Sequence, residues 1–255
     1  MNQITDMHCH ILPGLDDGSK SMEETMEALR EASRQGITSV IATPHYYPGR
    51  YEPDAGEVLH AWRQVKQRIS LEGLPLALYP GQECFYYSGL LEQLEEGEVL
   101  TLARSLYVLV EFDPECPYLQ LLQGLTELQQ GGYYPVLAHF ERYKCLRDIQ
   151  RLYELKSRGI WLQMNFDTLL TRDSIFHRNP WRQLAAEGMA DFFGSDCHGM
   201  DFRPYRVQKA CSWMEEHLSP GILQRTMQSN IQKILKSEQQ AVSYTHLTLP
   251  TILLV

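Results

Sequence analysis

Imidazole and carboxylate side chains that could bind metal ions recur along this chain at the ends of short apolar segments. They are His8, His10, His45, Glu83, Glu111, His139, Asp196 and His198. One histidine in such a place is usually an ordinary buried residue. Eight such groups after apolar stretches indicate that one fold collects them at a common rim, and this donor set suits divalent metals. The pattern therefore predicts an enzyme with a multinuclear metal centre.

Two pairs of these groups have a spacing of two residues. In a strand, His8 and His10 would point to the same side of the sheet. The alternative is two buried histidines satisfied by hydrogen bonds, but the acidic turn at 16–18 just downstream favours a metal. Asp196 and His198 repeat the spacing; their alternative is a helix N-cap beside a surface histidine.

Two glutamates, Glu83 and Glu111, follow nearly continuous apolar segments. A buried carboxylate is unfavourable without a cation. That cation could be an arginine, either Arg104 or Arg142. We favour a metal cation instead, with the carboxylate bridging two metal ions.

Two arginines, Arg142 and Arg203, lie a few residues beyond metal-ligand candidates. A planar guanidinium group matches phosphate oxygens in a two-pronged geometry. The alternative for each is a surface salt bridge. Aromatic residues also follow ligand positions and would either line a cleft or pack loops: Tyr46, Tyr47, Phe85, Tyr86 and Tyr87.

Apolar, β-branched segments alternate with helical patterns throughout the chain. We expect strands at 3–8, 38–43, 76–82, 106–111, 135–139, 160–164 and 190–195, and helices at 21–35, 54–72, 88–95, 117–131, 145–158, 178–187, 206–217 and 220–239. Ser21 and Glu24 suggest a capping box at the first helix. Strict alternation implies a parallel sheet, and seven units favour an α/β barrel with its site at the carboxyl ends of the strands.

The composition limits the classes of protein that are possible. The chain has 255 residues, 44% of them apolar, which fits a single barrel domain over residues 1–240. The net charge of −9 argues against nucleic acid as the main partner. No signal peptide or apolar membrane segment is recognisable, and six scattered cysteines fit a reduced, cytoplasmic protein. Residues 241–255 break the pattern and are expected to be a non-native or disordered tail, so His246 is excluded.

The ordered motifs resemble a known superfamily. They are Asp-x-His-x-His, Asp-Asp-Gly, Thr-Pro-His, Gly-x-Glu, Glu-Phe, Ala-His-x-Glu-Arg-Tyr, Gln-x-Asn and Ser-Asp-x-His, and they extend over roughly residues 3–236. This succession resembles the polymerase-and-histidinol-phosphatase (PHP) superfamily. More narrowly, it resembles the bacterial manganese-dependent tyrosine phosphatases of capsule and exopolysaccharide clusters.

The resemblance implies a distorted (β/α)7 barrel of the PHP type with three metal ions. His8, His10, Glu83 and Asp196 would hold the first ion. Glu83, as a bridge, would hold the second together with Glu111 and His139. Asp17, His45 and His198 would hold the third, although the spacing does not separate Asp17 from Asp16. Arg142 and Arg203 would grip the phosphate, and Gln163 and Asn165 match a polar pair near the substrate.

The same resemblance implies a function. A metal-bound hydroxide would attack the phosphorus of phosphotyrosine, on a partner that is a bacterial tyrosine autokinase. Manganese is the expected metal, with iron, cobalt or zinc as alternatives. The oligomeric state, including a homo-oligomer, is left open. The alternative substrate is histidinol phosphate or another small phosphomonoester. A further alternative is a catalytically inactive scaffold, which a missing metal-ligand residue would indicate.

A different phosphatase chemistry is also considered. The spacing Cys-x5-Arg, typical of thiolate phosphatases, occurs at Cys145–Arg151 and Cys197–Arg203. The first lies in a plain helical pattern without glycine, and Pro204 disturbs the loop that the second would need. We therefore favour the metal. His60, His177 and His217 are expected to be ordinary surface residues.

Overall fold

The structure, a computed structural model, describes residues 4–171 and 179–236. His177 and the expected tail at 241–255, with His246, lie outside the described residues. The strands are β1 (Ile4–Cys9), β2 (Ile37–Ala42), β3 (His45–Tyr46), β4 (Ala77–Pro80), β5 (Glu83–Phe85), β6 (Tyr107–Glu111), β7 (Tyr134–Leu137), β8 (Trp161–Asn165) and β9 (Phe192–Gly194).

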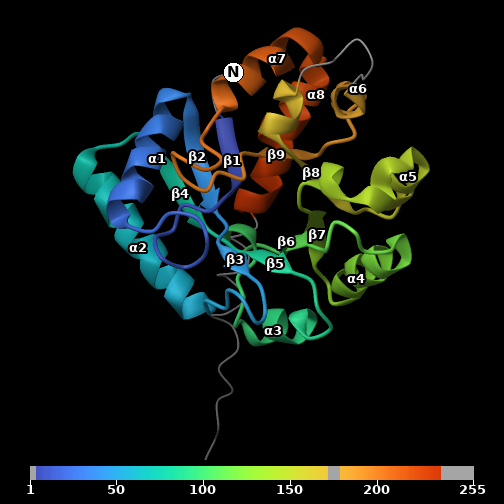
Figure 1. The fold of residues 1–255 in the computed structure, drawn as a ribbon, viewed down its shortest axis with the longest axis horizontal. Coiled ribbons are helices and arrows are strands. Elements are labelled where there is room, and N and C mark those ends of the chain that lie inside the picture. The colour runs from blue at the N-terminus through green and yellow to red at the C-terminus, as the bar shows by residue number, and fades with distance from the viewer. Residues whose placement is uncertain (1–3, 172–178, 237–255) are drawn as a thin grey trace, which may run out of the picture.

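Helices follow the strands and surround them (Figure 1). They are α1 (Met22–Arg34), α2 (Ala55–Glu72), α3 (Leu90–Glu96), α4 (Tyr118–Gln130), α5 (Ile149–Ser157), α6 (Pro180–Ala186), α7 (Val207–His217) and α8 (Pro220–Gln224), which continues through a π-helical turn, Arg225–Ser229, into helix 230–236. No described helix has both the length and the apolar character needed to cross a bilayer.

The strands form two parallel sheets, with orders β1-β2-β4 and β3-β5-β6-β7-β8-β9. Since β3 continues the line of β2 and β5 that of β4, the nine strands occupy seven positions. Backbone hydrogen bonds join β1 to the segment after β9: Asp196 N–H donates to the His8 carbonyl and His10 N–H to the Cys197 carbonyl, both at 2.8 Å. These links complete a curled, barrel-like sheet and confirm the expected α/β barrel class.

Two short turns separate consecutive strands where the chain enters the site. Pro44, which has no N–H to donate, separates β2 from β3. Gly81 and Gln82 separate β4 from β5, so the strand expected at 76–82 ends at Pro80, and the short β5 beyond it was not expected. A Cβ at Gly81 would lie 3.3 Å from side-chain atoms of Ile41 and Leu102, so this close approach favours glycine.

A small apolar cluster fills the barrel interior. It gathers Met7, Ile41, Leu109, Val136 and Phe192 from five strands, together with Ile231 and Ile234 of the C-terminal helix. Side chains from strands across the sheet can meet in one cluster only on the inner surface of a curved sheet. The C-terminal helix therefore packs against this barrel interior.

Some helix starts differ from the expected ones. The helix expected at 145–158 begins at Ile149, because the Asp148 carboxylate accepts the Gln150 N–H as an N-cap. At α1, Ser21 accepts the Glu24 N–H, but the Glu24 carboxylate accepts from Lys20 N–H, so only half of the expected capping box forms.

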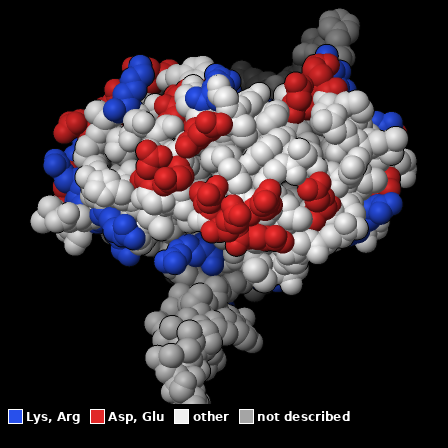
Figure 2. Space-filling model, turned by 90° about the horizontal axis from the view of Figure 1, so that it is seen from below, with Lys and Arg blue, Asp and Glu red and all other residues white. Residues whose placement is uncertain are grey.

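Figure 2 shows a face rich in acidic side chains, seen from the side of α3, which itself carries Glu92, Glu95 and Glu96.

Candidate metal centre

The structure brings the predicted ligands together at the carboxyl ends of the strands, around Glu83 on β5. One carboxylate oxygen of Glu83, Oε2, lies 3.1 Å from His8 Nε2, 3.2 Å from His10 Nε2 and 3.2 Å from His45 Nδ1. Its other oxygen, Oε1, lies 2.9 Å from His139 Nε2. Imidazoles from three other strand ends therefore meet at one fully buried carboxylate.

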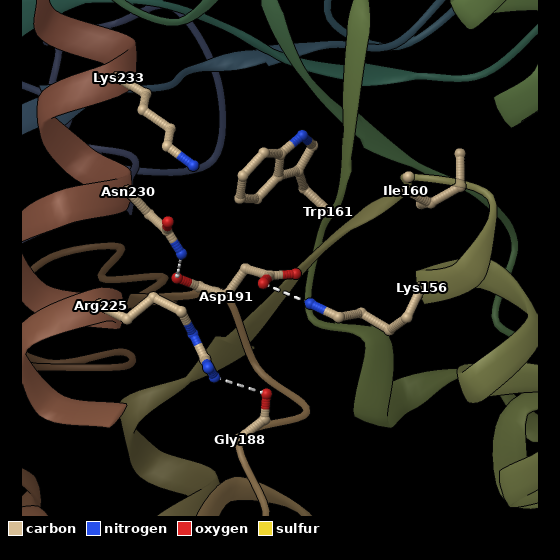
Figure 3. Close-up of a pocket in the computed structure, with 9 residues that line it drawn as sticks. Lys156, Ile160, Trp161, Gly188, Asp191, Arg225, Asn230 and Lys233 are labelled. Carbon is tan, nitrogen blue, oxygen red and sulfur yellow. Dashed lines mark hydrogen bonds and ion pairs between the residues drawn. The ribbon is translucent and has the colours of Figure 1, made fainter. Parts of the chain in front are cut away.

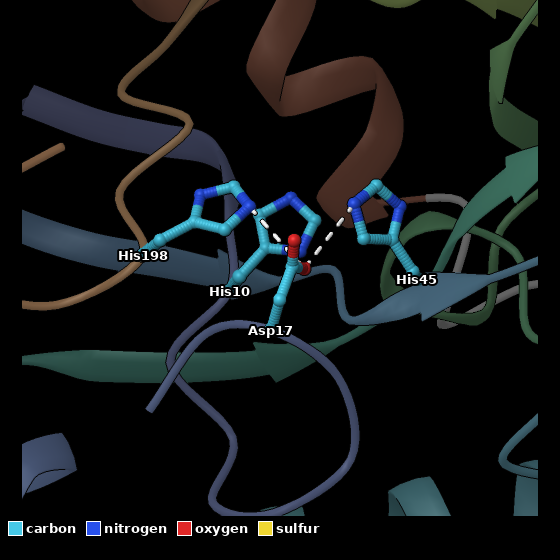
Figure 4. A group of neighbouring side chains, drawn as sticks. All are labelled: His10, Asp17, His45 and His198. Carbon is cyan, nitrogen blue, oxygen red and sulfur yellow. Dashed lines mark ion pairs between the residues drawn. The ribbon is translucent and has the colours of Figure 1, made fainter. Parts of the chain in front are cut away.

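Three overlapping sets of side chains could each hold an ion, with ligand atoms within 4.8 Å of one another. They are His8, His10 and Asp196; His45, Glu83 and Glu111; and His10, Asp17, His45 and His198 (the last set in Figure 4). His139 belongs beside the second set, because its Nε2 lies 3.3 Å from Glu111 Oε1. The grouping follows the three expected sites closely, with His10 and His45 each placed between two of them.

Hydrogen bonds on the far side of three imidazoles fix which nitrogen faces the cluster. His8 Nδ1 lies 3.1 Å from Gln163 Oε1, and His10 Nδ1 lies 2.7 Å from Asp16 Oδ2. His198 Nδ1 lies 2.9 Å from the Asp196 carbonyl. These partners are acceptors, so each Nδ1 carries the proton and each Nε2 presents a lone pair. This is the usual arrangement behind metal-binding histidines.

The cluster has features that a cation would satisfy. His8 Nε2 and His10 Nε2 lie 3.1 Å apart, and two facing lone pairs repel unless a proton or cation lies between them. Glu83 Oε2 and His45 Nδ1 are buried without a well-aligned hydrogen-bond partner in the described part of the chain. Buried polar atoms of this kind are rare in proteins. The donor set therefore fits bound divalent ions.

The charges lead to the same conclusion. Five carboxylates (Asp16, Asp17, Glu83, Glu111 and Asp196) share the site with two guanidinium groups, those of Arg142 and Arg203. Burial and then repulsion from Glu83 raise the pKa of Glu111 to about 9. Burial lowers the pKa of His139 to about 4. Glu83 and neighbouring carboxylates outweigh burial and raise the pKa of His8 and His10 as well, so in the metal-free site protons take the place of the positive charge that bound ions would supply.

The structure separates the roles of Asp16 and Asp17. Asp16 Oδ2 accepts the His45 N–H at 2.8 Å and binds His10 Nδ1, and its Oδ1 accepts the Gly18 N–H. Burial opposes ionisation of Asp16, but His10 outweighs it and lowers the pKa to about 2. Asp17 instead lies 3.7 Å from His45 Nε2 and 3.6 Å from His198 Nε2. Asp17 therefore faces the cluster, while Asp16 orients His10.

The two predicted arginines converge on one oxygen, Asp196 Oδ2. Arg142 Nη2 bonds to it, and Arg203 Nη1 lies 3.1 Å from it. Arg104, the other arginine considered for the glutamates, is exposed. The backbone is unusual here: His139, Asp196 and Arg203 have φ values of 31°, 53° and 51°, which non-glycine residues rarely adopt. Such strain is typical of functional sites.

The polar pair on β8 lies beneath the cluster. Gln163 is fully buried, and its Oε1 also accepts the His139 N–H at 2.7 Å. Its Nε2 donates to Asn165 Oδ1, and Asn165 Nδ2 donates to Asp196 Oδ2 at 3.0 Å. The pair therefore connects three of the candidate ligands through a chain of hydrogen bonds.

Comparison with known proteins identifies the family. A family model described as "Capsular polysaccharide synthesis, CpsB/CapC" matches residues 4–236. The chain belongs to this family. The match confirms the resemblance to the capsule-cluster phosphatases that the motifs indicated.

Relatives within the CpsB/CapC family carry enzyme names. The chain is 33% identical over 217 residues to "Tyrosine-protein phosphatase YwqE" of Bacillus subtilis, covering 84% of each chain. It is 32% identical to "Tyrosine-protein phosphatase CpsB" of Streptococcus pneumoniae, over 81% of this chain and 88% of the relative.

Comparison with solved structures agrees with this family assignment. One from a report on YwqE and CpsB, "unique metal-dependent tyrosine phosphatases", matches with a TM-score of 0.80 and 32% identity, covering 92% of this chain and 95% of the other. A histidinol phosphate phosphatase from Lactococcus lactis matches with a TM-score of 0.55 at 15% identity, over 84% and 93% of the two chains, which shows a shared fold only.

An open cavity of about 330 Å³ lies above the cluster in this CpsB/CapC member. Its wall includes Tyr47 and Phe85, which stack with ring centroids 4.1 Å apart, and Phe202, which is 59% exposed. Of the aromatic residues that follow ligand positions, these first two face the cavity. Tyr46 is buried, and the hydroxyls of Tyr86 and Tyr87 bond to Glu127 and Gln93.

The thiolate alternative has no support in this geometry. Cys197 is fully buried, its Sγ lies 3.6 Å from the Gly199 carbonyl, and burial raises its pKa to about 12. Arg151 donates to the backbone carbonyl of Cys145 instead of facing its thiol. His60 and His217 are exposed, as expected.

Two positioning residues were not assigned roles from the sequence. Buried Asp6 accepts the Ser195 N–H at 2.7 Å and the Ser195 hydroxyl at 2.6 Å, which ties β1 to the segment before Asp196. Glu141 accepts the Asn165 N–H at 2.9 Å. Both lie inside recognised motifs, next to ligand or arginine positions, and that adjacency was the available signal.

Proposed function

We propose that this chain is a metal-dependent protein-tyrosine phosphatase that acts in capsule or exopolysaccharide synthesis. The observation that carries the proposal is the convergence of imidazoles and carboxylates on Glu83, directly beside two arginines and an open cavity. The names of its relatives in the CpsB/CapC family support the same activity.

Three divalent ions would be held by these residues. His8, His10, Glu83 and Asp196 would bind the first, and Glu83, Glu111 and His139 the second. Asp17, His45 and His198 would bind the third. We propose manganese, with iron, cobalt or zinc as ions that the same donors accept. When bound, such ions lower the pKa of water and neutralise phosphoryl oxygens.

The protein's own groups would bind and orient the phosphate. Arg142 and Arg203 both contact Asp196 Oδ2 and line the cavity. Their guanidinium groups would donate to the phosphoryl oxygens and stabilise the charge that develops in the transition state. Gln163 and Asn165 would act by orienting His8 and Asp196, since both lie below the cluster.

The cavity wall suits an aryl ester. A phenyl ring could pack against the Tyr47–Phe85 pair and Phe202 while its phosphate reaches the arginines. Phenolate, with a pKa of about 10, also leaves more easily than an alkoxide. We therefore propose phosphotyrosine of a bacterial tyrosine kinase as the substrate. A cytoplasmic location is proposed as well, in keeping with six free cysteines.

The decisive experiment compares phosphotyrosine peptide and histidinol phosphate in one preparation, with manganese and with EDTA. We expect manganese-dependent hydrolysis of the peptide and much weaker hydrolysis of histidinol phosphate. Activity that survives EDTA but is lost in Cys197→Ser would overturn the proposal. A preference for histidinol phosphate would reassign the substrate, and a protein without bound metal or aryl phosphatase activity would indicate a scaffold.

A further inference from the structure

A second cavity, of about 310 Å³, lies at the opposite ends of the strands that carry part of the metal centre. Trp161, at the start of β8, and Asp191, just before β9, line it (Figure 3). Lys156 of α5 and Arg225 and Lys233 of the C-terminal helical segment reach it from two sides. It is therefore separate from the phosphatase site.

The wall of this cavity is cationic. It contains three basic side chains, Lys156, Arg225 and Lys233, and one carboxylate, that of Asp191. The chain as a whole has a net charge of −9, so such a concentration of basic groups is unusual for this protein. Clustered lysine and arginine side chains in a concave site favour an anionic ligand.

Defined neighbours hold Lys156 and Lys233 in place. Asp191 is 3% exposed; it pairs with Lys156 and accepts the Leu162 N–H at 3.0 Å. Asn230, 2% exposed, donates to the Asp191 carbonyl at 3.0 Å. Lys233 Nζ lies 4.8 Å from the centre of the Trp161 ring. The basic groups are thus attached to a fixed framework and are not scattered surface residues.

The helix that supplies Arg225 is locally widened. A π-helical turn spans Arg225–Ser229, and the Asn230 N–H donates to the Arg225 carbonyl. This i→i+5 bond brings residues five apart into line, so Arg225 and Asn230 both line the cavity. Isolated π-turns of this kind frequently occur at functional sites.

Gly188 leaves room for the guanidinium group. Arg225 Nη2 donates to the Gly188 carbonyl at 2.8 Å, and a Cβ on Gly188 would lie 2.5 Å from that nitrogen. Gly188 also has a φ of 80°, which side-chain-bearing residues rarely adopt. The absence of a side chain therefore places the arginine against the backbone at the edge of the cavity.

We propose that this cavity binds a small phosphate-bearing anion at a site distinct from the phosphatase centre. The guanidinium group of Arg225 and the ammonium groups of Lys156 and Lys233 are the donors that recognise phosphate oxygens. The volume is at the lower end of the range for small-molecule sites, so the ligand is a compact phosphorylated compound.

Inorganic pyrophosphate is the probe for the test. It is titrated into metal-depleted full-length protein by calorimetry and by tryptophan fluorescence, which reports on Lys233 beside Trp161. We expect Arg225→Gln/Lys233→Gln to weaken binding at least tenfold, while Arg142→Gln/Arg203→Gln retains it. Trp161→Phe should remove the fluorescence change but keep the heat of binding.

A matched control is available on α2, where Lys66 Nζ lies 4.7 Å from the centre of the Trp62 ring. Arg63→Gln/Lys66→Gln removes the same charges and the same kind of cation–ring contact away from the cavity, and should leave binding intact. Binding lost only with Arg142 and Arg203, or absent from the parent protein, would overturn the proposal. Equal affinity for citrate would overturn the assignment to phosphate. None of these readouts depends on phosphatase activity.

Discussion

The two ends of β8 and β9 differ in charge and in what they can bind. At their carboxyl ends, Asn165 and Asp196 belong to a site with an excess of carboxylates and imidazoles. At their amino ends, Trp161 and Asp191 border a cavity with an excess of basic groups. Buried apolar residues of these strands, such as Leu162, Met164 and Phe193, lie between the two ends, so one scaffold keeps two opposite electrostatic environments apart. Each end is suited to a ligand of opposite charge.

The largest expected effect on activity comes from neutralising Glu83, in the metal centre at the carboxyl ends of the strands. Glu83→Gln keeps the size of the side chain but removes a charge that contacts four imidazoles. We expect kcat/KM for a phosphotyrosine peptide to fall at least on the order of 10³-fold, together with bound metal. His60→Gln, an exposed histidine on α2, should change neither. Full activity in Glu83→Gln would contradict a metal centre at the carboxyl ends of the strands, and with it the contrast between the two ends.

Arg142 and Arg203, in the same site, should affect catalytic activity without affecting metal content. Arg142→Gln and Arg203→Gln should each lower kcat/KM roughly 10²-fold, because each loses a donor to the phosphate. Metal analysis of the purified variants should match the parent protein. If metal is lost as well, these arginines support Asp196 and do not bind substrate.

Beneath the cluster, Gln163→Leu should act through the metal. It removes the acceptor of His8 Nδ1 and of the His139 N–H. We expect metal affinity to fall about 10–100-fold, with most activity restored at high metal concentration. Loss of activity that excess metal does not restore would point to a direct role with substrate.

The pH dependence of stability should differ between the metal-free and metal-loaded protein. In the metal-free protein the pKa of Glu111 is raised to about 9 by burial and by Glu83, and that of His10 is raised because Asp16 and Glu83 outweigh burial. The folded state therefore binds more protons than the unfolded state above pH 6.5, so stability falls as pH rises towards 9.

Metal replaces these protons, so its apparent affinity should rise over the same range. Thermal melts at pH 6.5 and 8.5, with EDTA and with manganese, provide the measurement. We expect the stabilisation by manganese to be larger at pH 8.5. A smaller stabilisation at the higher pH would contradict this account of the cluster.

The smallest effect, on stability, is expected at the cavity beside the amino ends of β8 and β9. Gly188→Ala places a Cβ against Arg225 at a positive φ and should cost about 1–2 kcal/mol of unfolding free energy. Gly221→Ala, on α8 with open space around it, should instead be neutral or stabilise by up to about 1 kcal/mol. Denaturant midpoints compare the two. Phosphatase activity should be unchanged in both variants at a temperature where they are folded.

Much of the fold and of the candidate site could be anticipated from local sequence. Strand–helix alternation gave the barrel class, and each ligand follows an apolar segment because strand ends meet at one rim. What was missed depends on three-dimensional contacts. The strand expected at 76–82 ends at Pro80, and the short β5 follows the close approach of Gly81 to Ile41 and Leu102, which no local pattern encodes.

The same limit applies within the site. Asp16 and Asp17 are adjacent, and only their contacts with His10 and His198 distinguish an orienting carboxylate from a candidate ligand. The π-turn at Arg225–Ser229 lies inside a segment whose periodicity predicts a plain helix. Its register is set by packing against the barrel, so the cationic cavity could not be foreseen from the sequence.

The hydrogen bonds between Asp6 and Ser195 have a consequence for biosynthesis. The two residues are 189 positions apart, and His8 and Asp196 lie directly beside them. A nascent chain released before β9 and the segment after it emerge from the ribosome lacks both the partner of Asp6 and two of the candidate ligands. Catalytic competence therefore requires translation beyond His198, and products truncated before Ser195 would be inert.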